Sequence, residues 1–79
     1  MRGPKYKNRE VQTIGSWWIA TAQSYFGFVA WAKRSPIRGD SPLTEPDDGD
    51  DVWFEFGDTR AEVLDRMKND LGLSEAKSP

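Results

Sequence analysis

The strongest constraint on the fold is a helix whose start, buried face and end are all encoded between residues 59 and 73. Thr59-Arg60-Ala61-Glu62 matches the capping box, in which the threonine hydroxyl accepts the glutamate amide hydrogen and the glutamate side chain reaches back. Gly72 followed by Leu73 has the composition of a Schellman stop. Between these ends, apolar residues follow the spacing of one helix face: Val63, Leu64, Met67 and Leu71. The sequence therefore predicts one amphipathic helix that closes the fold.

Three segments before this helix show the alternation of β-strands, and the polar pair Gln23-Ser24 makes the first two a hairpin. Residues 17–22 place Trp18, Ala20 and Ala22 on one face and Trp17, Ile19 and Thr21 on the other. Residues 25–33 place Phe26, Phe28, Ala30 and Ala32 on one face and Tyr25, Val29, Trp31 and Lys33 on the other. In residues 52–56, Val52, Phe54 and Phe56 are predicted to face inward and Trp53 and Glu55 outward. The predicted fold class is α+β, a three-stranded antiparallel sheet with one C-terminal helix packed on one face, in the order β-β-β-α.

The chain of 79 residues has room for one domain, which we place at residues 14–73. Residues 1–13 are predicted to be a flexible basic arm and residues 74–79 a disordered tail. Residues 35–51 contain three prolines and two glycines and end in an aspartate run, which predicts a long acidic loop. Loops of this length are more often functional or disordered than structural.

One helix covers only one face of such a sheet, yet the outward set is strongly apolar. It consists of Trp17, Ile19, Val29, Trp31 and Trp53. We expect the arm, the long loop or another chain to cover part of it.

The chain has no histidine and no cysteine, so the commonest general base, nucleophilic thiol and transition-metal ligands are missing. The acidic run lacks the spaced ligands of a calcium loop, which favours a solvated loop over a metal site. We therefore predict a protein that is not an enzyme and that uses neither a metal nor another cofactor.

Protein binding explains the aromatic residues with the fewest assumptions, because aromatic side chains dominate interface energetics. The predicted partner-binding residues are Trp17, Trp31, Trp53, Asp47, Asp48, Asp50 and Asp51. An exposed edge strand can also pair with a strand of another chain, and a homodimer is its simplest form.

Binding of single-stranded nucleic acid is the alternative function. Residues 1–38 carry seven lysines and arginines against one acid, whereas residues 39–79 carry twelve acids against four bases. Exposed Trp31 and Trp53 would stack bases while the basic arm neutralises phosphates. The arm residues are Arg2, Lys5, Lys7 and Arg9.

No stretch of the sequence has the length and apolar content of a membrane span, and no signal peptide is recognisable. We therefore expect a cytoplasmic protein without a membrane partner.

The segment from Phe56 to Leu64, FGDTRAEVL, and the helix through Leu73 resemble the HicB-like antitoxin domain, as does the run from Tyr25 to Ala30, YFGFVA. The resemblance covers residues 16–73. It implies a partial ribonuclease-H-like fold and a role in neutralising a protein partner. The sequence departs from the family's complete members in that no DNA-binding module is recognisable in it. We therefore expect the partner to be a toxin ribonuclease. The acidic run motivates the alternative that, in a phage or plasmid protein, the partner is a host nuclease whose basic groove receives the acidic loop.

Overall fold

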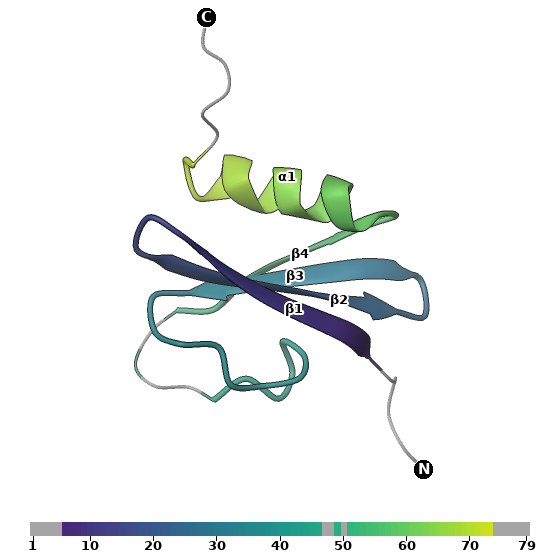
Figure 1. The fold of residues 1–79 in the computed structure, drawn as a ribbon, viewed down its shortest axis with the longest axis horizontal. Helices are drawn as coiled ribbons and strands as arrows, with labels where there is room; N and C mark the ends of the chain where they lie inside the picture. The colour runs from purple at the N-terminus through teal and green to yellow at the C-terminus, as the bar shows by residue number, and fades with distance from the viewer. Residues whose placement is uncertain (1–5, 47–48, 50, 74–79) are drawn as a thin grey trace, which may run out of the picture.

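A computed structural model describes residues 6–46, 49 and 51–73 of the chain, and all structural statements concern these residues. They form a four-stranded sheet and one helix (Figure 1). The elements are β1 (Lys7–Ile14), β2 (Trp17–Ser24), β3 (Gly27–Lys33), β4 (Trp53–Gly57) and α1 (Arg60–Asp70). All neighbouring strands are antiparallel and lie in chain order, β1-β2-β3-β4. The α+β class, the antiparallel sheet and the C-terminal helix are thus confirmed, but the predicted number of three strands is wrong.

The additional strand is β1, which occupies most of the segment predicted to be a basic arm. Its residues pair with β2 from Lys7 opposite Gln23 to Ile14 opposite Trp17. The segment was missed because seven of its eight residues are exposed and its sequence, KNREVQTI, is mostly polar. Its backbone groups nevertheless complete the ladder along β2. Tyr6 directly precedes β1, while residues 1–5 of the predicted arm and the predicted tail, 74–79, lie outside the described residues.

The hairpin between β2 and β3 turns two residues later than predicted. Ser24 pairs with Gly27, so Tyr25 and Phe26 form the turn and are 71% and 89% exposed. Gly27 has a φ of 136°, and a Cβ at this position would collide with the carbonyl oxygen of Gly57 at the end of β4. Only glycine fits this close approach between the hairpin and the end of β4.

The predicted helix termini are both present. The Thr59 hydroxyl accepts the Glu62 N–H at 3.0 Å, and the Glu62 carboxylate accepts the N–H of Asp58 at 3.2 Å. At the other end, the Leu73 N–H donates to the Lys68 carbonyl at 2.7 Å while Gly72 has a φ of 72°, as in a Schellman motif.

Helix α1 packs on one face of the sheet, which we call the helix face (Figure 1). The core of this layer consists of Ile19, Ala30, Ala32, Val63 and Met67, all fully buried. Arg60 joins the layer to the edge of the sheet, because its guanidinium donates to the Thr21 hydroxyl at 2.6 Å and to the Asn8 carbonyl at 3.0 Å. The helix thereby holds the start of β1 as well as the centre of the sheet.

The segment between β3 and β4 covers the opposite face, which we call the loop face (Figure 1). Ile37 from this segment packs on a second core cluster, which contains Ala20, Ala22, Val29 and Trp31. Tyr6, from the segment predicted to be an arm, packs on the same cluster. Two of the covers expected from the sequence, the long loop and the arm segment, therefore both contribute to this face.

Glu45 fastens this segment to the sheet. Its carboxylate, with no exposed surface, accepts the Trp31 indole N–H at 2.7 Å and lies 2.9 Å from the Lys33 ammonium. It also accepts the backbone N–H groups of Arg38 and Gly39, each at 3.0 Å. Four donors thus converge on one buried carboxylate.

The side chains of β4 point to the faces opposite to those predicted. Trp53 and Glu55 pair with Ala32 and Ala30 and so belong to the helix face. Phe54 and Phe56, predicted to point inward, lie on the loop face and are 55% and 54% exposed. They remain open because the loop covers the centre of the sheet and not this edge.

No helix in the described part of the chain is both long and apolar enough to cross a membrane.

Candidate functional site

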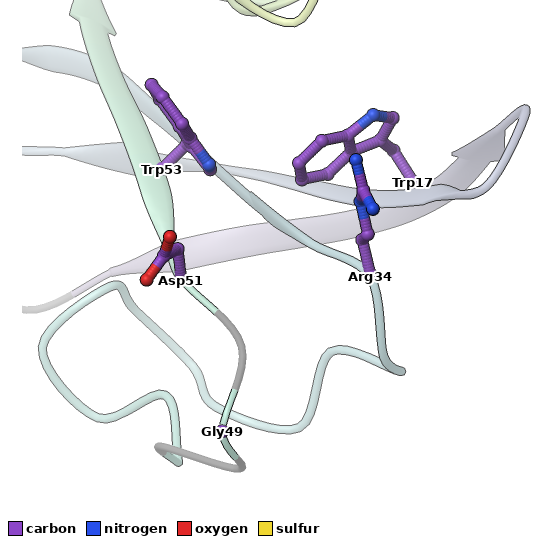
Figure 2. A pocket seen from close by; sticks show the side chains of 5 residues that line it. All are labelled: Trp17, Arg34, Gly49, Asp51 and Trp53. Carbon is purple, nitrogen blue, oxygen red and sulfur yellow. The ribbon is translucent and has the colours of Figure 1, made fainter.

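A cavity of about 380 Å³ lies where the loop leaves β3 and returns to β4 (Figure 2). Its walls come from the start of β2, the end of β3, the loop and the start of β4. They are Trp17, Arg34, Gly49, Asp51 and Trp53. Three residues predicted to bind a partner, Trp17, Trp53 and Asp51, thus meet in one place, although up to 36 positions separate them in the sequence.

One wall of the cavity is formed by a cation–π pair between Arg34 and Trp17. The Arg34 guanidinium lies 4.8 Å from the centre of the Trp17 ring, and Figure 2 shows it rising from the end of β3 against this ring. Trp17 also packs on the helix-face core. On this side of the cavity, the aromatic face of Trp17 is therefore already covered by a cation.

The opposite wall also presents a tryptophan ring, but no cation lies on it in the described part of the chain. Trp53 is 45% exposed, and Asp51 lies at the base of β4 beside it (Figure 2). The Asp51 carboxylate has no hydrogen-bond or ion-pair partner within the described part of the chain. An open indole next to an unneutralised carboxylate suits a positively charged group.

The second component of the site is the free edge of β4. This strand pairs with β3 on one side, and among the described residues no strand neighbours it on the other. Three of its five residues are exposed aromatics, Trp53, Phe54 and Phe56, and the two phenylalanine rings contact each other edge to face at 5.9 Å. The strand contains no proline, and Glu55 is its one charged residue.

The other edge of the sheet is protected. The pairing of β1 is irregular between Lys7 and Glu10, and Asn8 adopts a φ of 56° at this bulge. Bulges and charged side chains both prevent the addition of another strand. The two edges therefore differ, and β4 is the one that is open to pairing.

The remaining predicted residues do not join this site. Trp31 has no exposed surface because the loop lies over it, so it is not part of this site, and its contact with a partner stays a prediction. Asp47, Asp48 and Asp50 lie outside the described residues, as do Arg2 and Lys5. Lys7 and Arg9 are exposed in β1, where Arg9 donates to the Gly39 carbonyl at 2.8 Å and so supports the loop.

Sequence reasoning missed Arg34, Phe54, Phe56 and Glu45. Trp17 begins the first strand of the hairpin, and Arg34 directly follows the second. Because antiparallel pairing brings these two ends together, their positions are a weak sequence signal for the Arg34–Trp17 pair. No local signal distinguishes Glu45 from the other acids of the loop.

Within the described residues, no three acidic side chains are grouped so that they could hold a metal ion. Comparisons with family models, curated proteins and solved structures find no match to this chain.

Proposed function

We propose that this chain is a non-enzymatic protein-binding module that captures its partner at the free edge of β4 and the adjoining cavity. The observation that carries this proposal is the exposure of Trp53, Phe54 and Phe56 on one unprotected edge strand. Solvent-exposed aromatic residues on an open edge favour aggregation unless a partner covers them.

The physical chemistry of this surface suits a protein better than a nucleic acid. An added strand gains backbone hydrogen bonds along the edge, and the aromatic side chains supply the large buried areas that dominate interface energetics. The Asp51 and Glu55 carboxylates beside Trp53 would repel phosphates from the one indole that is open for stacking.

The HicB-like resemblance supports a more specific version of this proposal. The strand β4, the turn Gly57-Asp58-Thr59 and the helix α1 are the elements that carry it. In this version the partner is a toxin ribonuclease or a host nuclease in the cytoplasm, which the chain inhibits by occupying its surface.

The test is affinity capture from the native source with two matched variants. F54K/F56K places lysines on the open edge, where they oppose strand addition. V11K changes an apolar side chain, 38% exposed, on the protected edge strand β1 and serves as the control. We expect wild type and V11K to enrich the same protein, and F54K/F56K to recover at least about tenfold less, the loss that 1.4 kcal/mol of binding energy produces.

Thermal denaturation by circular dichroism shows whether both variants are folded. Equal enrichment by all three proteins would contradict the role of β4. Failure to enrich any protein, together with quenching of tryptophan fluorescence by single-stranded RNA at low salt, would instead favour the nucleic-acid alternative.

A further inference from the structure

The open edge strand presents two chemically different rows of side chains. Successive residues of a strand point to opposite faces, so Trp53 and Glu55 of β4 share one face and Phe54 and Phe56 the other. Just before the strand, Asp51 lines the same cavity as Trp53, and Val52 packs on the loop-face cluster. The pairing of Trp53 with Ala32 and of Phe54 with Trp31 assigns the first row to the helix face and the second to the loop face.

The helix-face row reads acid, tryptophan, acid: Asp51, Trp53 and Glu55. Neither carboxylate has a hydrogen-bond or ion-pair partner within the described residues, and the tryptophan ring between them is 45% exposed. An arginine or lysine side chain from a neighbouring strand would lie against this ring with a carboxylate on either side. Arg34 on Trp17, at 4.8 Å, is the same interaction made within the chain.

The loop-face row is entirely apolar: Val52, Phe54 and Phe56. Val52 packs on the loop-face core, while the two phenylalanines are more than half exposed and contact each other. A strand beside β4 would therefore meet apolar surface at every second position.

We propose that the partner supplies an extended segment in which arginine or lysine alternates with apolar residues, and that this segment adds to β4 as a fifth strand. Its basic side chains lie on the helix face with Asp51, Trp53 and Glu55, and its apolar side chains cover Phe54 and Phe56 on the loop face. This inference rests on the proposed function and names the chemistry of the partner.

A second copy of β4 fits this edge poorly. Two β4 strands that overlap along their full length, Trp53–Gly57, are centred on Glu55, and a symmetric antiparallel pair then sets this carboxylate opposite its own copy. Like charges directly opposite each other destabilise a strand pair. The acidic row thus favours a basic segment over self-association.

The probe is a fluorescein-labelled heptapeptide of alternating lysine and valine, titrated against the full chain by fluorescence anisotropy. The first control peptide has the same composition, with all lysines before all valines. The second control peptide alternates glutamate and valine. We expect the alternating basic peptide to bind at least about tenfold more tightly than either control, because only it matches both rows. Equal binding of the block peptide would show unspecific charge attraction and overturn the proposal.

Chain variants locate the interaction. D51N/E55Q removes the acidic row and should weaken binding of the alternating peptide about five- to tenfold, a range set by two surface charge pairs. D40N/D65N removes two exposed acids elsewhere and should leave the affinity unchanged. Amide chemical shifts in nuclear magnetic resonance spectra should change most between residues 51 and 57; largest changes in β1 would contradict the proposal.

Capture from the native source separates this inference from the proposed function. If F54K/F56K loses the partner and D51N/E55Q keeps it, the chain binds protein at β4 but not through a basic strand. If wild type self-associates in light-scattering measurements and F54K/F56K does not, the occupant of the edge is a second copy, and the inference is wrong.

Discussion

Replacing Glu45 by glutamine removes the charge that holds the loop on the sheet while keeping the size of the side chain. One carboxylate oxygen accepts the Trp31 indole and the Gly39 N–H, and the other faces the Lys33 ammonium and the Arg38 N–H. An amide keeps an acceptor for only one of these pairs and turns an NH₂ group toward the other. In E45Q the Lys33 ammonium, which has no exposed surface, loses the Glu45 carboxylate and keeps the Pro46 carbonyl at 3.2 Å.

The magnitude follows from the pKa of Glu45. Burial alone would raise this pKa, but hydrogen bonds from the Arg38 N–H, the Lys33 ammonium, the Trp31 indole and the Gly39 N–H outweigh it and lower the pKa from 4.5 to about 2. A difference of about 2.5 pH units between unfolded and folded chain corresponds to about 3 kcal/mol of stability. A domain of this size has a total stability of about 4–12 kcal/mol, so this one group contributes a large share.

The direction of the pH dependence is fixed by the lowered pKa. The stabilisation is complete above pH 4.5, the ordinary value, and is lost as the pH falls toward about 2. Wild type should therefore lose about 3 kcal/mol across this range through Glu45 alone. E45Q should be less stable than wild type by about 3 kcal/mol at pH 7, and this gap should close as the pH approaches 2.

The assay is urea denaturation followed by tryptophan fluorescence at a series of pH values, since Trp31 reports directly on the loop. D40N, which removes an exposed acid of the same loop, should keep the wild-type acid dependence and is the matched control. A gap between E45Q and wild type that stays constant from pH 5 to pH 2 would refute the assignment. If E45Q does not fold, a carbon-13 titration of the Glu45 carboxyl in wild type measures the same pKa.

Two further substitutions test local features of the fold by urea denaturation. T59A removes the hydroxyl that caps α1 and should cost about 1 kcal/mol, whereas T13A at an exposed position of β1 should cost less than about 0.5 kcal/mol; equal losses would contradict the capping role. G27A forces a Cβ against the Gly57 carbonyl at a φ of 136° and should cost about 3 kcal/mol or more. G15A, at a φ of 63° with nothing within 4 Å of its Cβ, should cost only about 1 kcal/mol, and a reversed order would show that space at the hairpin is not limiting.

The candidate site was predictable in part. The sequence singles out Trp17, Trp53 and Asp51, which line one cavity, as candidates for contact with a partner, because large aromatics and acids beside a proline-rich loop stand out locally. It cannot show that Trp31 is covered, since burial of this indole depends on Glu45, which lies 14 residues away. The sequence also gives no indication that Arg34 lies on the Trp17 ring and leaves the Trp53 ring exposed.

The orientation of β4 shows the same limit. Alternation in Trp53–Gly57 separates two rows of side chains but does not say which row faces the helix. Pairing with β3 decides this, and it turns Phe54 and Phe56 away from α1. Strand β1 was hidden for a related reason: an edge strand exposed on most of its residues carries no apolar alternation, and its pairing with β2 depends on backbone groups that every sequence has.

By itself, the sequence determined what depends on residues close together in the chain: the helix with both its caps, the strand character of the aromatic segments and the extent of the loop. Such features are local because hydrogen bonds and side-chain contacts over three or four residues create them. The tertiary structure decided which faces are covered, which edge is open and which aromatics remain exposed. These depend on strand register and on single long-range contacts such as that between Glu45 and Trp31, whose partners no local pattern specifies.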